Sequence, residues 1–408
     1  MAKTKLWNLN FFLLWQGQFV SSLGDVVYYI ALGFWVLNLT GSTAVMGTLM
    51  AVSSLPRVLV SAFAGVIVDR SDRKWLLVFM DLIRGIAIVF VGVAAYLGFV
   101  KIVMVFIAGV IISLCGAFFN PAVSSILPDI VDKNKLVQAN SVFSIIYTGT
   151  GIVGNPAGGI LYKTLGAPFM FLFNGLSYLF SALTVILIRV PKIVHTKELP
   201  HFFQDMKIGF NFIWQVKGLR LLMMMACVLN LFAIIGIMLI LPLFEQAKHL
   251  GPSLYGVLMG FFTGGMLLGY LFGSVANIPA ERRFAIFIPC FIVNCLCLIF
   301  LPIYLNFSFI VVLAGLAGFT MALLNAFINS VIQMTTPQDM RGKVFGFLSS
   351  IVSGLNPVAF AVGGILAELI SVRAVISSSF LVCLILFALL STSDAFRRFI
   401  NFDPDKPG

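Results

Sequence analysis

Charged residues are scarce in this sequence. Asp, Glu, Lys and Arg together make up only 10% of the 408 residues, whereas 60% are hydrophobic. A soluble domain is about a quarter charged and about half apolar, so the composition excludes an ordinary soluble protein. The apolar runs are continuous and lack the alternation of β-barrel strands. We therefore predict an all-α membrane protein.

Residues that commonly carry catalysis or bind metals are also sparse. There are only three histidines, and His195 and His201 fall in a polar segment where we expect solvated side chains. The six cysteines lie inside apolar runs without His or acidic companions, as small apolar filler does. No span carries paired histidines, a Ser–His–Asp set or clustered carboxylates. The sequence thus predicts no enzyme, no metal site and no cofactor.

The net charge of +11 does not indicate nucleic-acid binding. The basic residues are spread over loops on one predicted side and do not gather in one patch. The predicted external turns hold four Lys and Arg residues, while the termini and opposite loops hold twenty. This asymmetry places both termini in the cytoplasm and requires an even number of spans.

Twelve segments are long and apolar enough to cross a bilayer, for which a helix needs about 20 residues. They are predicted at 11–38, 44–68, 75–98, 103–127, 137–163, 168–189, 219–245, 252–276, 284–304, 308–333, 343–370 and 373–395. We expect two six-helix bundles, over 1–190 and 219–396. A cytoplasmic linker over 191–218 joins them, and a cytoplasmic tail covers 397–408.

Two further patterns support this organisation. Phenylalanines near helical spacing, from Phe202 to Phe212, predict an amphipathic cytoplasmic segment within the linker. The halves repeat weakly, since Asn155-Pro156 and the glycines after it resemble the stretch that begins at Asn356-Pro357. Parallel repeats of this kind are typical of secondary transporters.

A charged loop between the second and third spans carries a family resemblance. It reads Gly65-Val-Ile-Val-Asp69-Arg70-Ser-Asp72-Arg73-Lys74. The pattern resembles the signature loop of the major facilitator superfamily, a family of secondary transporters. The resemblance implies a conformational role for Gly65, Asp69, Arg70, Arg73 and Lys74. It also implies that Asp69 braces the N-terminal end of the eleventh helix, where a carboxylate suits the helix dipole.

Three other stretches resemble one branch of that superfamily. They are Leu23-Gly24-Asp25, Leu55-Pro56-Arg57 and Phe119-Asn120-Pro121, and the branch holds bacterial macrolide-efflux and enterobactin-export proteins. The likeness implies alternating access and export of small molecules by proton antiport. We also expect a monomer in the lipid bilayer of a bacterial cell membrane, either an inner or a plasma membrane.

Asp25 is the leading candidate for proton coupling. It lies about 22 Å along its span from Asn10 at 1.5 Å per residue, close to mid-membrane. A carboxylate there costs about 3 kcal/mol or more unless it is paired, protonated or wet. Arg57, in the neighbouring span, lies at a similar depth and is the predicted partner. The alternative is a permanent Asp–Arg pair that only fixes helix packing.

Polar side chains inside apolar spans are the candidates for substrate binding. The predicted set is Gln18, Asp25, Asn120, Asn230, Asn325 and Asn329. Each could instead join helices by hydrogen bonds. Phe, Met and Asn outnumber charges here, so a bulky, largely apolar solute is favoured.

The fifth span contains a run of small residues, Gly154, Asn155, Pro156, Gly158 and Gly159. It resembles a glycine–proline motif of superfamily antiporters, with the proline one position later, and predicts a bend in the helix. In the third span, Asp81 and Arg84 are spaced to form a local pair near the cytoplasm.

Two other functions remain open at this point. A flippase for a lysophospholipid or similar lipid would share a Gly-Asp pair in the first span. A receptor-like module without transport would gain little by retaining Asp25 and Arg57 inside the membrane. Export of small amphipathic compounds is therefore the leading hypothesis.

Overall fold

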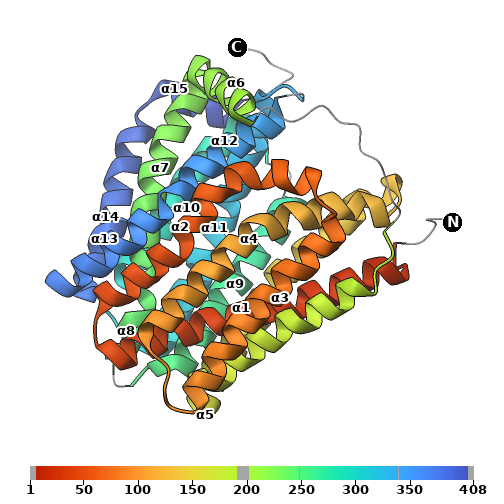
Figure 1. Cartoon of the computed structure of the whole chain (residues 1–408). Helices are drawn as coiled ribbons and strands as arrows, with labels where there is room; N and C mark the ends of the chain where they lie inside the picture. The colour runs from red at the N-terminus through yellow and green to blue at the C-terminus, as the bar shows by residue number, and fades with distance from the viewer. Residues whose placement is uncertain (1–5, 191–201, 248, 277, 339, 403–408) are drawn as a thin grey trace. The chain divides into compact units, whose positions relative to one another are not determined.

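The computed structural model describes residues 6–190, 202–247, 249–276, 278–338 and 340–402. Within these ranges every regular element is helical (Figure 1). The first half contains α1 (Leu9–Thr40), α2 (Thr43–Arg70), α3 (Arg73–Tyr96), α4 (Ile102–Ile130), the short 3₁₀ helix η1 (Lys133–Lys135) and α5 (Leu136–Ile186). The second half contains α6 (Phe202–Gln215), α7 (Lys217–Met238), α8 (Ile240–Gln246), α9 (Gly251–Val275), α10 (Ala280–Phe300), α11 (Phe307–Thr335), α12 (Arg341–Gly354), α13 (Asn356–Leu369), α14 (Val372–Ser391) and α15 (Asp394–Ile400).

Eleven helical segments in the described ranges are long and apolar enough to cross a membrane. One of them, in α5, is 49 residues long, about twice the length that a bilayer needs. Its backbone leaves helical geometry at Gly166, with φ 75° and ψ 176°, a conformation that glycine adopts without steric cost. Counted as two spans, α5 brings the total to twelve. The prediction of an all-α, multi-pass membrane protein is confirmed.

Two other predicted spans are interrupted. The seventh is divided between α7 and α8 at Leu239, and the eleventh between α12 and α13 at Leu355. Pro357 lies in the first turn of α13, where the lack of an amide hydrogen costs least. Each pair of helices is still continuous enough to count as one candidate span.

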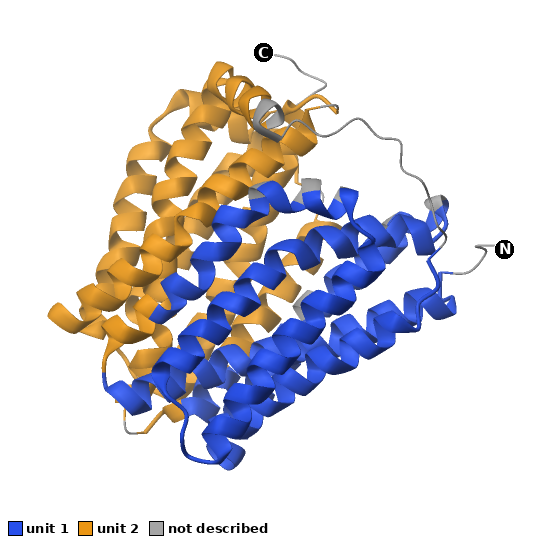
Figure 2. Ribbon diagram, in the orientation of Figure 1, with its two compact units in different colours: residues 1–41, 49–200, 252–257 blue, residues 42–48, 201–251, 258–408 orange. Residues whose placement is uncertain are grey.

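The chain divides into two compact units (Figure 2). Unit 1 comprises residues 1–41, 49–200 and 252–257, and unit 2 comprises residues 42–48, 201–251 and 258–408. The predicted bundles at 1–190 and 219–396 remain a prediction. The units differ from them most plainly in the first residues of α2 and α9.

Unit 1 is organised around α5, against which α1 and α3 both pack. Glycines permit the close approach on both sides. A Cβ at Gly24 of α1 would lie 2.6 Å from the Asn174 side-chain oxygen of α5. A Cβ at Gly85 of α3 would lie 3.1 Å from the Gly175 carbonyl oxygen of α5. The second half of α5 is therefore held between residues of α1 and α3.

In unit 2, α7 packs against α13 and α14, and α10 packs against α11 and α14. The amphipathic helix predicted in the linker is present as α6. It packs on α12, with the Phe210 and Phe347 ring centroids 5.5 Å apart, while Trp214 is exposed. The predicted surface histidines, His195 and His201, lie outside the described residues.

Candidate functional site

Asp25 lies in α1 and is half-buried within unit 1. Its carboxylate accepts a hydrogen bond from the Tyr178 hydroxyl of α5. Tyr178 is 1% exposed, so close packing holds the side chain that donates this hydrogen bond. The contact joins residues 153 positions apart in the chain, and the close packing of Gly24 on α5 makes it possible.

A second buried residue, Arg84 of α3, also contacts Tyr178. The Arg84 guanidinium is 4.1 Å from the centre of the Phe119 ring and 4.3 Å from that of Tyr178. It also forms an ion pair with Asp81, one turn earlier on α3. The pair that the sequence predicted therefore forms, but it is buried, with Asp81 0% and Arg84 5% exposed. Tyr178 thus contacts both Asp25 and the Arg84 guanidinium.

Arg57 takes a different position from Arg84. Its side chain is exposed, and no ion pair joins it to Asp25, although its backbone N–H donates to the Ser113 hydroxyl at 3.1 Å. Both arginines interact electrostatically with Asp25, and the interaction with Arg84 is the stronger. The part of Arg57 in coupling remains a prediction.

Gln18 and Asn120, the other two candidates for substrate binding in unit 1, differ from each other in exposure. Gln18 is 4% exposed, and the nitrogen of its side-chain amide has no hydrogen-bond partner. Asn120 is exposed at the point where Pro121 follows in α4. Unit 1 therefore offers one buried free amide and one exposed amide, in addition to Asp25.

The signature loop is anchored by Arg73 at the start of α3. Its guanidinium lies 2.9 Å from the Asp129 carboxylate and donates to the Ser125 carbonyl at 2.9 Å, both in α4. Asp72 caps α3 by accepting from a backbone N–H of its first turn at 3.2 Å. The other predicted members are Gly65, Asp69, Arg70 and Lys74. Arg70 is exposed, and Lys74 lies 5.7 Å from the Trp75 ring.

Gly65 and Asp69 lie in the last turns of α2, and the surroundings of both residues lie outside the structure's description. The bracing of the eleventh span by Asp69 therefore remains a prediction.

The run of small residues in α5 serves close packing. A Cβ at Gly154 would lie 3.1 Å from Val26, and one at Gly158 2.9 Å from Ile30, both in α1. Gly159 faces Gly256 of α9 within unit 1, where an added Cβ would lie 3.0 Å from the opposite Cα.

Asn155 and Pro156 complete this run. The Asn155 side chain donates to the Gly151 carbonyl at 2.8 Å, so its amide serves its own helix. Gly166 is the one position at which α5 leaves helical geometry, and the bend around Pro156 remains a prediction.

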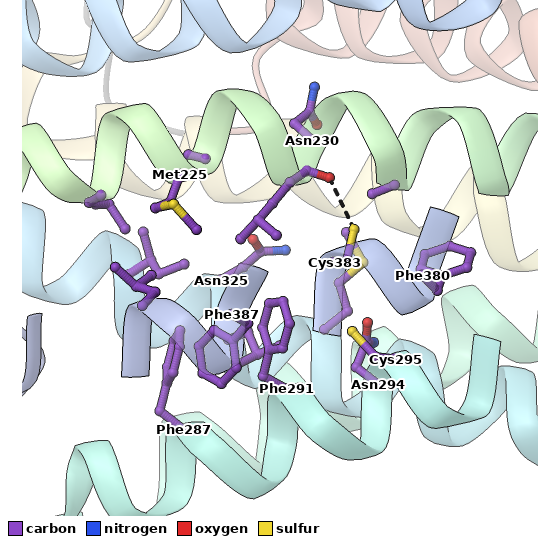
Figure 3. Close-up of a pocket in the computed structure, with 18 of the residues that line it drawn as sticks. Met225, Asn230, Phe287, Phe291, Asn294, Cys295, Asn325, Phe380, Cys383 and Phe387 are labelled. Atoms are coloured by element: carbon purple, nitrogen blue, oxygen red, sulfur yellow. Dashed lines mark hydrogen bonds between the residues drawn. The ribbon is translucent and has the colours of Figure 1, made fainter. Parts of the chain in front are cut away.

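Unit 2 contains a cavity of about 200 Å³ (Figure 3). It is lined by residues of α7, α10, α11, α14 and α15, and most of these are aromatic or aliphatic. Phe291 and Phe387 stack across it with ring centroids 3.9 Å apart. Cys295 and Cys383 also line it. No charged residue is among the lining side chains.

Three asparagines supply the polar groups of the cavity. Asn230 donates to the Val352 carbonyl at 3.1 Å and to the Asn356 side chain at 3.0 Å. Asn294 donates to the Ala317 carbonyl at 2.8 Å. Within the described part of unit 2, the structure records no hydrogen bond of the Asn325 side chain.

Asn329, one turn further along α11 than Asn325, is exposed and does not line the cavity. Of the three binding residues predicted in unit 2, Asn230 and Asn325 therefore line the cavity and Asn329 does not.

Sequence reasoning did not single out Tyr178 or Asn294. Both are polar side chains inside apolar spans, which is the same signal that indicated Asn230 and Asn325. Among the described residues there is no group of three or more His, Cys, Asp or Glu side chains able to hold a metal ion.

Curated relatives of this chain include efflux proteins. It is 25% identical over 396 residues to macrolide efflux protein A of Streptococcus pyogenes, covering 94% of this chain and 96% of that protein. It is 26% identical over 363 residues to the multidrug efflux pump Tap of Mycolicibacterium fortuitum, covering 86% and 87%.

Solved structures share the fold over nearly the whole chain. The nucleoside transporter NupG superimposes with a TM-score of 0.74 at 13% identity, covering 96% of this chain and all of that one. A bacterial homologue of the iron transporter ferroportin gives 0.67 at 16%, covering 94% and 98%. The model of the family described as Major Facilitator Superfamily matches residues 14–355, most of the chain. This chain therefore belongs to the Major Facilitator Superfamily and is a multi-pass membrane transporter, not an enzyme.

Proposed function

We propose that this transporter exports small amphipathic compounds by alternating access, driven by proton antiport. The observation that carries the proposal is the cavity of unit 2, whose lining is apolar apart from three neutral amides. A site without charge favours a largely apolar solute over a sugar phosphate or an amino acid. The names of the relatives, macrolide efflux protein A and multidrug efflux pump Tap, are in line with such a solute.

The volume of the cavity limits what it takes up. Sites for drug-sized ligands have volumes of roughly 300–1,000 Å³, whereas this cavity holds about 200 Å³. An apolar cavity of about 150 Å³ in another protein stays dry and binds benzene. We therefore assign the cavity to an apolar ring or side group of the exported compound, and not to the whole compound.

Proton coupling is assigned to Asp25. A half-buried carboxylate in a membrane-spanning helix gains or loses a charge at a large free-energy difference, which is what coupling to a proton gradient requires. The hydrogen bond from Tyr178 holds the carboxylate in place. Arg57, exposed and within electrostatic reach, is proposed to respond to the charge of Asp25.

The remaining expectations belong to the same proposal. The protein is proposed to act as a monomer in the bacterial inner membrane with both termini in the cytoplasm, as the distribution of Lys and Arg favours. The bundles at 1–190 and 219–396 are proposed to be the bodies that move during alternating access. The signature loop is proposed to steady one of the two end states through Asp69.

Uptake of ethidium into inverted membrane vesicles tests the proposal. We expect wild-type vesicles to accumulate the dye when a proton gradient is imposed, and Asp25→Asn vesicles to lose that dependence. Glu245→Gln is the matched control, since it removes a carboxylate near the end of α8 in unit 2, and it should transport as the wild type does.

Gradient-driven uptake at the wild-type rate by Asp25→Asn would refute the coupling role. If neither protein moves ethidium or a macrolide but the wild type moves a fluorescent lysophospholipid, the lipid flippase replaces the exporter.

A further inference from the structure

The buried charges of unit 1 do not balance. Asp25 and Asp81 carry two carboxylates around one buried guanidinium, Arg84, and Tyr178 contacts both Asp25 and Arg84. With both carboxylates ionised this cluster has a net charge of −1, and with one proton bound it is neutral. Arg57 is not counted in this cluster, because its side chain is exposed and the described residues show no ion pair between it and Asp25.

We propose that Asp25, Asp81, Arg84 and Tyr178 act as one unit that binds a single exchangeable proton, with Asp81 and Arg84 setting how tightly Asp25 holds it. The proton adds to the Asp25 carboxylate and leaves from it, and no other bond is made or broken. This inference rests on the proposed role of Asp25 as the group that carries the proton. Asp81 and Arg84 are positioning residues, since they act through Asp25.

The geometry distinguishes this cluster from a simple structural ion pair. A buried pair that serves only stability is expected to have its polar atoms satisfied by hydrogen bonds. Among the described residues, Arg84 Nε is buried without a hydrogen-bond partner, and the Asp81 carboxylate faces the Ser181 hydroxyl of α5 without a well-formed hydrogen bond to it. The guanidinium is held instead by two aromatic faces, Phe119 and Tyr178, which leave part of its edge free. The pair therefore keeps unused bonding capacity beside Asp25.

Other titratable groups face the cluster, and none of them is a second buried cation. They are Tyr28 and Tyr29 of α1, Arg57 of α2, Cys115 of α4 and Tyr178 of α5. Phenols and thiols that stay neutral do not change the charge balance. Among these described groups, Arg84 is the buried positive charge that both carboxylates share.

Charge substitutions give two opposite expectations. Asp81→Asn removes a negative neighbour, so Asp25 holds its proton less tightly and titrates at lower pH. Arg84→Gln removes the positive neighbour, so Asp25 titrates at higher pH. Unit charges less than about 10 Å apart at an effective dielectric constant of about 20 shift a titration by roughly one pH unit. The double variant, Asp81→Asn with Arg84→Gln, leaves Asp25 near its wild-type midpoint.

Infrared difference spectroscopy of the purified full-length protein, recorded over a series of pH values, measures this directly. The readout is the carbonyl stretch of a protonated carboxylic acid, assigned to Asp25 by its loss in Asp25→Asn. We expect the pH midpoint of this band to fall in Asp81→Asn and to rise in Arg84→Gln. In the double variant the midpoint should return close to the wild-type value. Glu245→Gln is the control for removal of a carboxylate elsewhere in the chain, and it should leave the pH midpoint of the Asp25 band unchanged.

Three results would overturn the proposal. These are the absence of an Asp25 band that titrates, single variants that leave its midpoint unchanged, and single variants that shift it in the same direction. Where a single variant fails to fold, the charge-balanced double variant decides, because a midpoint displaced by about one pH unit or more contradicts the charge accounting.

The titration needs no transported compound, so it separates the two proposals. If the midpoints shift in opposite directions but no gradient-driven uptake occurs, the exporter proposal alone is refuted. If uptake occurs but the midpoint does not shift in the variants, the cluster proposal alone is refuted.

Discussion

Replacing Asn325 with leucine tests whether the cavity of unit 2 binds the exported compound. Asn325 is the useful position because the amides of Asn230 and Asn294 already bond to the protein, whereas the structure records no bond of the Asn325 side chain. Leucine has the same branched shape with four side-chain heavy atoms and is somewhat larger, so thermal unfolding must show that packing is retained. The substitution removes one neutral hydrogen bond to the ligand, worth about 1 kcal/mol. We expect the dissociation constant to rise roughly fivefold.

The matched control lies on the same helix. Asn329→Leu makes the same chemical change one turn away, at an exposed position that does not line the cavity. Equilibrium dialysis of ethidium against purified protein gives the dissociation constants of both variants, and thermal unfolding shows whether either has lost stability. An unchanged affinity in Asn325→Leu, or an equal loss in Asn329→Leu, would refute the assignment of the cavity.

Two further substitutions test the packing that shapes the molecule. Phe291→Ala removes a ring stacked at 3.9 Å on Phe387 and enlarges the cavity. The free energy of unfolding, measured by denaturant titration, should therefore fall by about 3–5 kcal/mol. A loss below about 1 kcal/mol would mean that the ring is not part of the packed wall. Gly256→Val places a branched side chain where even a Cβ lies 3.0 Å from the Gly159 Cα, and overpacking should lower stability by about 1–3 kcal/mol. A melting temperature equal to that of the wild type would contradict the close approach of α5 and the first turns of α9.

The helices and Asp25 could be read from the sequence because both signals are local. A bilayer-length apolar run needs no partner to be recognised, and a carboxylate within such a run is costly wherever the helix packs. The hydrogen-bond partner of Asp25 could not be read in this way. Arg57 was favoured because its span follows directly in the chain, whereas Tyr178 comes from α5, 153 positions away. Close packing through Gly24 brings the two together.

The predicted binding residues of α11 show a second limit of sequence-based prediction. Asn325 and Asn329 lie one helical turn apart, so their spacing places them on nearly the same face of α11. Only the packing of α7, α10 and α14 decides that Asn325 lines a cavity and Asn329 does not. The cavity is likewise a property of five helices that meet, and no single segment of the sequence encodes it.

The two thiols in the cavity wall have a consequence for chemical probes of this protein. Cys295 of α10 and Cys383 of α14 both line the cavity, and Cys383 Sγ lies 3.6 Å from the Leu229 carbonyl oxygen, to which it donates (Figure 3). Both thiols are almost completely buried, and a thiol in apolar surroundings stays protonated, whereas the thiolate is the reactive form. We therefore expect both cysteines to resist cysteine-directed reagents in the folded protein. Their labelling would report that the packing of α10 and α14 around the cavity has opened.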